Sequence, residues 1–443
     1  MRVTVVGTGY VGLVSGVCLA SVGHHVVCVD RDASRVDSIS AGTVPFHEPG
    51  LQEMLGAHLG DRFRASRHLS AEVATSDVTL IAVGTPSKDG AIDLRDVEEA
   101  ARQVGAALPR DRFPTVAVKS TVIPGTTDGL IREALEAAGG RAGAAFGLGM
   151  NPEFLTEGRA VDDFMHPDRV VIGADDPRSM KVLRRLYASF SGVPVLECST
   201  RTAEMTKYAS NALLATAISF ANELANFAEA IGGIDLEEVM RGVHASRYLT
   251  VLDPDAGRMP ELVNFLRAGC GFGGSCLPKD VSALVAAGAA RDERMPLLRA
   301  VLDVNDGRAE RMLRHLRKYV PRIAGTRLAV LGLAFKADTG DIRESPAIPI
   351  VRRLIEAGAE VTAHDPAVEK EALAGLGLDR LVVTGDLAAA VAGVDAILIV
   401  TSWPEYRRLP QLLDNLGVDP PLIDGRRVLS PHDVPRYSGI GLA

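Results

Sequence analysis

The chain has 443 residues, 47% of them hydrophobic and 23% charged, a composition typical of a folded protein with two or three hydrophobic cores. The net charge of −8 argues against a general nucleic-acid or membrane-surface binder, because such proteins need a basic field that attracts phosphates. Five scattered cysteines lack both a disulfide framework and the CxxC spacing of zinc sites, so we expect reduced thiols, no metal and a cytoplasmic protein.

The first 200 residues alternate β-branched runs with helix-like stretches, which predicts a parallel sheet covered on both faces. The expected strands are residues 3–6, 26–29, 78–83, 115–118 and 170–172. The chain opens directly on the first of these, so we expect no signal peptide, and no apolar run approaches the roughly 20 residues of a membrane span.

A glycine loop, Gly7-Thr8-Gly9-Tyr10-Val11-Gly12, lies between the first expected strand and a helix. In this context GxGxxG indicates a dinucleotide site, because the glycines let the backbone approach a pyrophosphate at the helix N-terminus. Asp30 ends the next strand, where a carboxylate binds ribose hydroxyls and repels a 2′-phosphate. We therefore predict NAD rather than NADP; the alternative is a tight turn without a ligand.

Two carboxylates, Glu153 and Glu157, lie four residues apart in Asn151-Pro152-Glu153-Phe154-Leu155-Thr156-Glu157-Gly158. A helix that begins after Pro152 would place both on one face. The alternative is an exposed acidic first turn, which is common because the helix dipole favours it.

Residues 203–231 contain no Gly or Pro and predict a single helix about 43 Å long. A helix of this length would bridge two domains or two subunits, and its largely apolar surface predicts a homodimer. Lys207 and Asn211 share one of its faces. Their Ala, Met, Tyr and Leu neighbours favour a functional role over a solvated surface. Residues 251–260, with two prolines and a glycine, predict a surface loop.

A glycine-rich segment, Gly269-Cys270-Gly271-Phe272-Gly273-Gly274-Ser275-Cys276-Leu277-Pro278-Lys279-Asp280, precedes another predicted helix. The helix dipole and Lys279 would both favour a thiolate at Cys276. Because the glycines would permit close approach of a ligand, we interpret Cys276 as reactive. The cysteines interpreted as inert small hydrophobic residues are Cys18, Cys28, Cys198 and Cys270.

The opening pattern is repeated near the C-terminus. Expected strands are residues 327–332, 360–363, 396–400 and 422–423, with a helix over 349–357. Gly332-Leu333-Ala334-Phe335 lacks the triple glycine, which favours a ligand other than a dinucleotide. The predicted fold is α/β, with two Rossmann-like doubly wound parallel-sheet domains (1–200 and 311–443) joined by the long helix and a helical middle domain (201–310).

These motifs together resemble the UDP-glucose/GDP-mannose dehydrogenase family over nearly the whole chain. Further stretches that carry the resemblance are residues 83–86, 119–122, 167–169, 332–336, 343–345 and 424–427. The resemblance implies an NAD-dependent oxidation of a nucleotide-sugar CH2OH to a carboxylate, through a thiohemiacetal and a thioester on cysteine. Residues 151–158 resemble most the branch that converts UDP-glucose to UDP-glucuronate, while dTDP-glucose and GDP-mannose stay open.

The resemblance also implies residue roles. Cys276 would be the nucleophile and Lys207 would stabilise the oxyanion, while Asp280 or Glu153 would be the base for thioester hydrolysis. Thr121, Glu153 and Asn211 would order a water or the reacting oxygen. Residues implied to contact NAD, besides the glycine loop and Asp30, are Arg35, Thr85, Thr121, Glu157, Lys279 and Arg343. Residues implied to bind substrate are Phe154, Leu155, Glu157, Lys207, Asn211, Phe265, Gly271, Gly273, Phe335, Lys336 and Arg426 or Arg427.

The sequence departs from the family pattern between Arg247 and Phe265, where the connection is longer. The arginine that reaches a neighbouring subunit's site in the family has Arg258 or Arg247 as its candidate here. Two other classes of protein compete with this interpretation. A β-hydroxyacid dehydrogenase also has a helix Lys with an Asn four residues on, but it needs one hydride, no cysteine and no second Rossmann-like unit. An NAD-sensing binding module would use its cysteine structurally.

Overall fold

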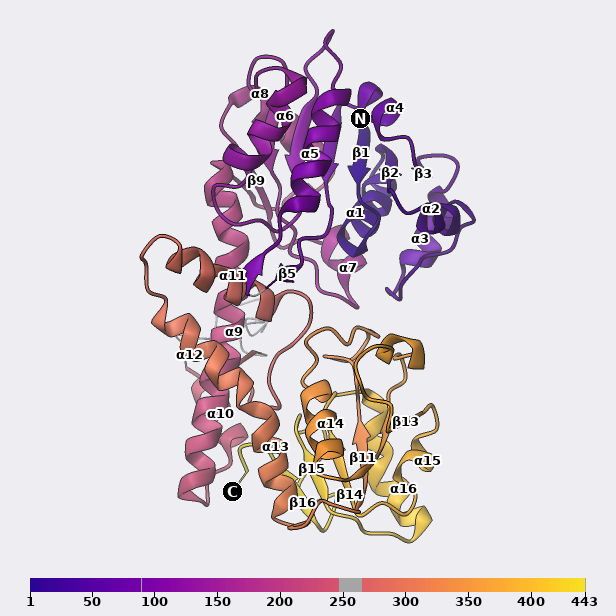
Figure 1. Ribbon diagram of the computed structural model, residues 1–443, viewed down its shortest axis with the longest axis vertical. Helices are drawn as coiled ribbons and strands as arrows, with labels where there is room; N and C mark the ends of the chain where they lie inside the picture. The colour runs from indigo at the N-terminus through magenta and orange to yellow at the C-terminus, as the bar shows by residue number, and fades with distance from the viewer. Residues whose placement is uncertain (89, 247–264, 443) are drawn as a thin grey trace. The chain divides into compact units, whose positions relative to one another are not determined.

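The structure is a computed structural model that describes residues 1–88, 90–246 and 265–442 (Figure 1). It divides into two compact units, residues 1–210 and 211–443. The predicted surface loop at 251–260 lies outside the described residues, and the predicted division into three domains at residues 200 and 310 stays a prediction.

The first unit is built on an eight-stranded sheet in the order β10-β9-β8-β7-β4-β1-β2-β3. Its strands are β1 (Arg2–Val6), β2 (His25–Val29), β3 (Phe63–Ser66), β4 (Val78–Ile81), β7 (Thr115–Val118), β8 (Gly147–Met150), β9 (Val170–Ala174) and β10 (Val195–Cys198). A separate hairpin pairs β5 (Ser87–Lys88) with β6 (Ala91–Ile92). The segment from β3 to β8 has the Rossmann strand order.

One edge of this sheet departs from the prediction. Strand β9 pairs antiparallel with β8, and β10 pairs parallel with β9, so these two strands run against the other six. The expectation of a wholly parallel sheet is wrong at this edge. An antiparallel edge on a parallel sheet is common in such folds, and an apolar run such as residues 170–172 does not encode its direction.

Helices cover both faces of the first sheet. They are α1 (Tyr10–Ser21), α2 (Ala33–Ser40), α3 (Leu51–His58), α4 (Leu69–Thr75), α5 (Arg95–Ala107), a π-helical turn (Thr127–Ile131), α6 (Arg132–Gly139), α7 (Ala160–Met165) and α8 (Pro177–Leu186). One hydrophobic cluster joins Val5 and Leu80 to α1, α3, α7 and α8, while another joins Val6 and Ile81 to α4, α5 and α6. Neighbouring residues of one strand thus face opposite clusters, as a pleated sheet requires.

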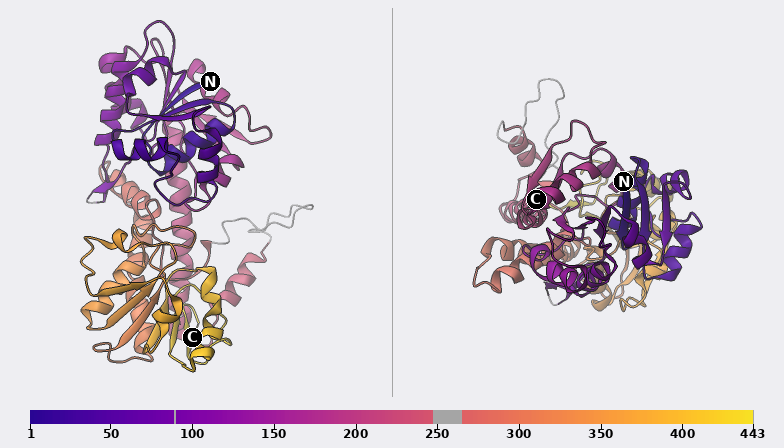
Figure 2. Two further views of the ribbon diagram at one scale, coloured as in Figure 1. Left: turned by 90° about the vertical axis from the view of Figure 1, so that its right-hand side faces the viewer. Right: turned by 90° about the horizontal axis from the view of Figure 1, so that it is seen from above.

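The predicted long helix is confirmed as α9 (Thr200–Ile231), which has 32 residues. Figure 1 and Figure 2 show it as one unbroken helix, and the division between the two units falls inside it. At 1.5 Å per residue it is about 48 Å long.

The second unit contains a six-stranded sheet in the order β13-β12-β11-β14-β15-β16, which is again the Rossmann order. Its strands are β11 (Arg327–Leu331), β12 (Glu360–His364), β13 (Leu381–Thr384), β14 (Ala396–Ile399), β15 (Leu422–Asp424) and β16 (Tyr437–Gly439). All five pairings are parallel. The prediction of two Rossmann-like domains is therefore confirmed.

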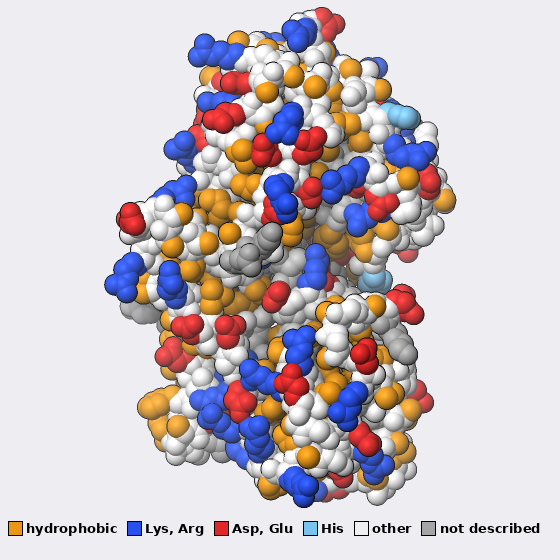
Figure 3. Space-filling model, viewed as in Figure 1, with side chains coloured by type: hydrophobic (Ala, Val, Ile, Leu, Met, Phe, Trp, Pro, Cys, Tyr) orange, Lys and Arg blue, Asp and Glu red, His pale blue; other side chains and the backbone are white. Residues whose placement is uncertain are grey.

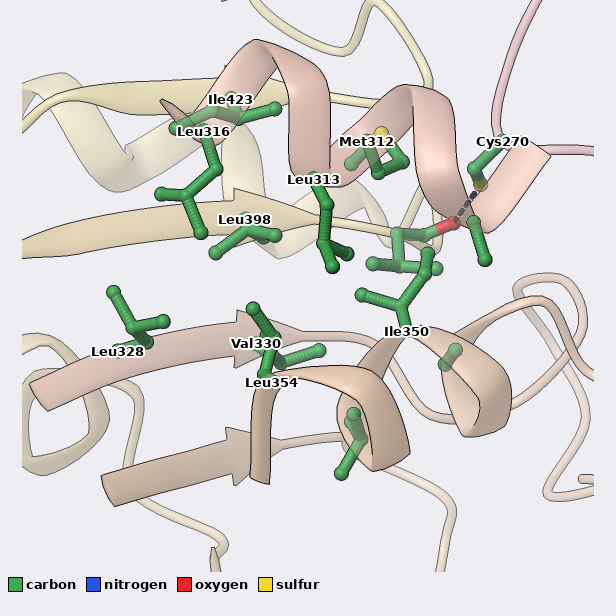
Figure 4. Packing of buried hydrophobic residues seen from close by; sticks show 14 of the residues in the cluster. Cys270, Met312, Leu313, Leu316, Leu328, Val330, Ile350, Leu354, Leu398 and Ile423 are labelled. Atoms are coloured by element: carbon green, nitrogen blue, oxygen red, sulfur yellow. Dashed lines mark hydrogen bonds between the residues drawn. The ribbon is translucent and has the colours of Figure 1, made fainter. Parts of the chain in front are cut away.

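Four helices of the second unit cover the two faces of its sheet, namely α13 (Arg308–Arg317), α14 (Ala347–Glu356), α15 (Leu387–Val391) and α16 (Leu409–Leu416). The other elements of this unit are α10 (Leu236–His244), α11 (Leu277–Ala289), α12 (Pro296–Asp306) and 3-10 turns at Lys370–Leu373 and Pro404–Arg408. Val330 lies in a cluster with α13 and α14, and Leu331 lies in another with α15 and α16. Figure 4 shows the first of these clusters.

No helix among the described residues is both long and apolar enough to cross a membrane. On the face seen in Figure 3, positive and negative side chains are interspersed.

Candidate active site

The glycine loop of the first unit has the geometry that a dinucleotide requires. Gly7 has φ +103°, and a Cβ there would lie 2.7 Å from the carbonyl oxygen of Ala82. A Cβ on Gly12 would lie 2.0 Å from the carbonyl oxygen of Gly7, whereas a Cβ on Gly9 would meet no atom within 4 Å. The first and third glycines are thus needed for the turn and for packing, and the second leaves open space at the N-terminus of α1 where a pyrophosphate fits.

Asp30 follows β2 and is tied to the same loop. One carboxylate oxygen accepts hydrogen bonds from the Thr8 amide (2.7 Å) and hydroxyl (2.6 Å), and the other accepts one from the Asp32 amide (2.9 Å). Burial alone would raise the pKa of Asp30, but these hydrogen bonds and the charge of Arg35 lower it below its ordinary value. The carboxylate is therefore ionised at neutral pH and faces the loop, as the NAD prediction requires.

A residue that the sequence reasoning missed, Glu48, connects this loop to the segment that carries Glu153. Its buried carboxylate accepts hydrogen bonds from the Tyr10 hydroxyl, from the Gly158 amide (2.8 Å) and from the Ala160 amide (2.7 Å). Tyr10 thus lies beside the backbone at Gly158. The sequence gives little signal for such a residue, because an acid in a segment rich in Pro and Gly usually lies on the surface.

The predicted helix after Pro152 is wrong. Residues 151–156 are irregular, and α7 begins only at Ala160. The Glu153 carboxylate accepts the Leu155 amide (2.6 Å), and Glu48 accepts the amides at the start of α7. These side-chain hydrogen bonds satisfy backbone N–H groups of the segment without a helix, so an irregular conformation is stable here.

Glu153 forms a buried ion pair with Lys207 of α9, with 2.9 Å between Oε1 and Nζ. Burial alone would raise the pKa of Glu153, but the charge and hydrogen bond of Lys207, the Leu155 amide and the charge of Lys119 together lower it. The Lys207 ammonium also lies 5.5 Å from the centre of the Phe154 ring. The structure therefore brings together Glu153, Phe154 and Lys207, and Lys207 is buried rather than solvated.

Thr85 and Thr121 lie together at the carboxyl edge of the same sheet, where Thr85 Oγ1 donates to the carbonyl oxygen of Thr121 (3.0 Å). The hydroxyl of Ser120, the residue before Thr121, donates to the Val83 carbonyl (2.7 Å). In a Rossmann sheet this edge, beyond the carboxyl ends of the strands, is where ligands bind.

In the second unit Cys276 is the N-cap residue of α11, with Pro278 in the first turn. The residue is partly exposed, and its sulfur lies 3.5 Å from the Ser275 hydroxyl. The predicted helix start at the cysteine is confirmed, so the positive end of the helix dipole acts on this thiol.

Asp280 lies one turn further along α11 and is buried. Its Oδ2 accepts a hydrogen bond from Asn211 Nδ2 (2.6 Å), and its Oδ1 lies 2.8 Å from Lys279 Nζ. The structure thus brings Asn211, Lys279 and Asp280 together beside Cys276. Lys279 is paired with Asp280, and its predicted roles, favouring the Cys276 thiolate and contacting NAD, stay predictions.

The glycines before Cys276 are explained by packing within the protein. A Cβ on Gly273 would lie 2.2 Å from the Glu344 carbonyl oxygen, and one on Gly274, which has φ +83°, would lie 2.9 Å from the Phe335 ring. A Cβ on Gly271 would lie 2.7 Å from Asn305 Oδ1. The interpretation that these glycines make room for a ligand is therefore not needed, and the case for Cys276 depends on its exposure and helix position.

The other cysteines differ from Cys276. Cys18, Cys28 and Cys270 are buried, and Cys198 is half-buried. Figure 4 shows Cys270 within the core, where its sulfur donates to the Val400 carbonyl (3.3 Å). Burial raises the pKa of each of these four thiols, for Cys18 to about 12. At neutral pH they are protonated and unreactive, as predicted.

The second sheet carries a different loop after its first strand. Gly332 makes the turn with φ +99°, as Gly7 does in the first unit. Asp365, at the position that corresponds to Asp30, is buried. Its Oδ2 accepts the amides of Leu333 (2.7 Å) and Ala334 (3.0 Å) and the Trp403 indole N–H (3.2 Å), and its Oδ1 accepts the amides of Ala367 (2.9 Å) and Val368 (3.2 Å). This carboxylate has little remaining capacity for ribose hydroxyls, which agrees with the prediction of a ligand other than a dinucleotide.

Basic side chains gather at the carboxyl edge of this second sheet. Lys336 Nζ lies 5.8 Å from the centre of the Phe335 ring. Arg426 donates to the carbonyl oxygens of Val400 (2.8 Å) and Gly271 (3.0 Å). Arg427 is instead paired with two carboxylates, Asp235 at 3.2 Å and Glu237 at 3.5 Å.

The remaining predicted residues are placed as follows. Arg343 is exposed and pairs with Asp341 (2.6 Å), and Phe265 is partly buried. Arg247 and Arg258 lie outside the described residues. Within residues 1–88, 90–246 and 265–442 no cluster of His, Cys, Asp and Glu could hold a metal ion.

A Rossmann glycine loop with its acid, and a second nucleotide-type sheet with a cysteine at a helix N-terminus, define a dinucleotide-dependent dehydrogenase. The chain belongs to the UDP-glucose/GDP-mannose dehydrogenase family: residues 1–191 match its NAD binding domain, 201–307 its central domain and 329–431 its UDP binding domain. The predictions of the family, of an NAD-dependent enzyme and of a nucleotide-binding C-terminal sheet are thereby confirmed.

Relatives match along the whole chain. A UDP-glucose 6-dehydrogenase of Haloferax volcanii is 41% identical over 99% of this chain and 100% of its own length. One of Rhizobium meliloti is 40% identical over 100% of this chain and 99% of its own. A solved UDP-glucose dehydrogenase of Pyrobaculum islandicum is 40% identical with a TM-score of 0.89, covering 100% of this chain and 98% of that one.

Proposed function

We propose that this enzyme oxidises UDP-glucose to UDP-glucuronate with two equivalents of NAD, through a thiohemiacetal and a thioester on Cys276. The observation that supports this most is Cys276 itself, a partly exposed thiol at the N-terminus of α11 with Asp280 one turn away. Conversion of an alcohol to an acid removes four electrons, and a covalent tether keeps the intermediate aldehyde from escaping between the two oxidations.

The proposed reaction consists of two oxidations and a hydrolysis. Bound NAD supplies the hydride acceptor for each oxidation. Loss of the first hydride and the hydroxyl proton turns the CH2OH group into an aldehyde, and the Cys276 thiolate adds to its carbon to form a C–S bond. Loss of a second hydride, together with the hydroxyl proton of this thiohemiacetal, gives the thioester. Water then attacks the thioester carbon, the C–S bond breaks, and the thiolate and a carboxylate are released.

Several side chains besides Cys276 have proposed parts in these steps. The Lys207 ammonium stabilises the oxygen as negative charge develops on it. Asn211 holds Asp280, and either Asp280 or Glu153 accepts the proton of the attacking water. Thr121 and Glu153 help to order that water. Asp30 and the glycine loop hold the adenosine half of NAD, with Arg35 beside them.

We assign the substrate diphosphate to Lys336 and Arg426. Arg427 is a poorer candidate because Asp235 and Glu237 already offset its charge. Phe335 packs against Gly274, near this group.

We favour UDP-glucose over N-acetylated sugars as the substrate because the relative named UDP-glucose 6-dehydrogenase in Haloferax volcanii is 41% identical, whereas a UDP-D-ManNAc dehydrogenase of Pyrococcus horikoshii is 27% identical. dTDP-glucose is one alternative substrate, since a single methyl group distinguishes thymine from uracil. GDP-mannose is the other.

Counting NADH per sugar tests the proposal. Purified enzyme with limiting UDP-glucose and excess NAD should release two NADH per sugar, with dTDP-glucose, GDP-mannose and UDP-N-acetylglucosamine assayed alongside. One NADH would indicate the chemistry of a β-hydroxyacid dehydrogenase, and none would indicate a binding module. Either result would contradict the proposed four-electron oxidation.

We further propose a homodimer that pairs through α9, in the cytoplasm. Large apolar side chains recur along this helix at Leu213, Phe220, Phe227 and Ile231, and Phe227 is 65% exposed. Such a stripe on a single chain favours burial against a second copy. Sedimentation should give a dimer at micromolar concentration, and Phe227→Glu should shift it towards monomer. A wild-type monomer in that experiment would refute the pairing.

A further inference from the structure

The first unit contains a second buried ammonium beside the Glu153–Lys207 pair, on Lys119. The residues Lys119, Glu153 and Lys207 have relative exposures of only 3%, 6% and 3%. Nothing in the chemistry proposed above uses Lys119. A buried lysine with no assigned function is unusual, because removing an ammonium from water costs free energy unless its charge interacts favourably with another group.

The fold holds Lys119 in one place. It follows β7 as Asn151 follows β8, and these strands pair in register at Val118 and Met150. Lys119 Nζ donates to Asn151 Oδ1 (3.1 Å), which also accepts the Tyr187 hydroxyl (2.5 Å). Asn151 Nδ2 in turn donates to the Val171 carbonyl (3.0 Å). The amide of Asn151 is therefore fixed, and it fixes the lysine.

The charges of the three side chains add to one positive charge. At 2.9 Å the carboxylate of Glu153 largely offsets the ammonium of Lys207, so this pair alone would act weakly on a distant negative charge. The charges that act on Lys119 are those of Glu153, which attracts it, and of Lys207, which repels it. With Lys119 included, the buried cluster is net positive.

We propose that Lys119 is a positioning residue for the dehydrogenation, whose ammonium offsets Glu153 so that Lys207 presents a net positive charge to the substrate oxygen. This inference rests on the proposed role of Lys207 as the group that stabilises the oxyanion. A preorganised positive charge in a dry site stabilises an oxyanion far more than the same charge in water. The contrasting role for Lys119 is purely structural, namely to anchor Asn151.

The protonation of Lys119 supports the inference. Burial lowers its pKa to about 8, with Glu153 raising it and Lys207 lowering it further. Above that pH the cluster loses its net charge. The first hydride transfer, which precedes attack by the Cys276 thiolate, should therefore slow in the wild type as pH rises through about 8. The titratable groups around the cluster are Glu153, Lys207 and, through Asn151, Tyr187.

The test uses Lys119→Met in the full-length enzyme, with UDP-glucose and NAD as the probe. The rate of the first hydride transfer, measured by rapid mixing, should fall about tenfold or more, while KM for both ligands changes less than about threefold. The alkaline fall near pH 8 should disappear. The matched control is Lys181→Met, which removes an exposed lysine from α8 of the same unit and should leave the rate unchanged.

A second variant separates charge from anchoring. Glu153→Gln in the Lys119→Met background returns the cluster to one positive charge, so the first hydride transfer should recover by about tenfold, even if thioester hydrolysis stays slow. A purely structural lysine would give no recovery. The inference is overturned if Lys119→Met keeps the wild-type rate, or if it slows the reaction and Glu153→Gln restores nothing.

The wild-type enzyme alone tests the role of Lys119 if the Lys119→Met variant does not fold. In that event the wild-type pH profile of the first hydride transfer serves as the test, and a rate that is constant from pH 7 to about 9.5 overturns the inference. Failure of the proposed function is seen separately, because wild-type enzyme would then not release two NADH per UDP-glucose.

Discussion

Replacement of Cys276 with alanine should abolish formation of UDP-glucuronate, with kcat reduced about 10⁴-fold or more, because the variant lacks the thiolate that is proposed to hold the aldehyde as a covalent adduct. Cys276→Ser should stall after covalent trapping or after a single hydride, since a hydroxyl is a much weaker nucleophile than a thiolate. Both are measured as NADH released per enzyme and per UDP-glucose. Normal turnover by the alanine variant would contradict the thioester mechanism.

The matched control for this experiment is Cys270→Ser, six residues earlier in the same glycine-rich segment. Cys270 is buried and its sulfur donates to the Val400 carbonyl, a bond that a serine hydroxyl can also make. This variant should keep its activity. Loss of activity in Cys270→Ser as well would mean that the segment is sensitive to any change, and Cys276→Ala alone would then not identify the nucleophile.

The parts of the fold that could be predicted are those with a strong local pattern. Residues 3–6 and 26–29 are nearly continuous β-branched runs, and their strands were predicted within one residue. The long helix follows from 29 residues without Gly or Pro, residues 203–231. By contrast, β3 has the sequence FRAS and β8 the sequence GLGM, which lack the β-branched residues that indicate a strand. Their pairing in the sheet, rather than their propensity, determines their structure.

The candidate site shows the same distinction between local sequence motifs and contacts with residues distant in the sequence. The glycine loop, Asp30 and the cysteine at a helix start are local motifs, so the sequence predicts them. Glu48 and Lys119 act through contacts with residues distant in the sequence, at Gly158 and Asn151, and a single sequence does not show which distant residues meet. The helix expected at 153–157 failed for a related reason, because the buried pair of Glu153 with Lys207 depends on a segment some fifty residues later.

Lys207→Met should reduce kcat about 10²- to 10³-fold with little change in KM, because it removes the ammonium that is proposed to stabilise the developing oxyanion. Loss of one partner from a buried ion pair also destabilises the fold, by at most about 3–5 kcal/mol, and less here because Lys119 still faces Glu153. Steady-state kinetics and thermal unfolding of the same preparation measure the two effects.

The pH dependence of the Lys207→Met loss follows from Glu153. In the wild type its pKa is lowered, so its contribution to stability is present above the ordinary carboxyl pKa and is lost only as pH falls through the lowered value. Without Lys207 the main cause that lowers this pKa is lost while burial still raises it, so the folded variant takes up the Glu153 proton at a higher pH than the wild type does. The difference in Tm between wild type and variant should therefore shrink as the folded variant takes up this proton on acidification, and a difference that grows would contradict the assignment. The double variant Lys207→Met with Glu153→Gln has no carboxylate left to take up a proton, so this pH dependence should disappear from its Tm, while kcat should stay low because no ammonium is present at position 207.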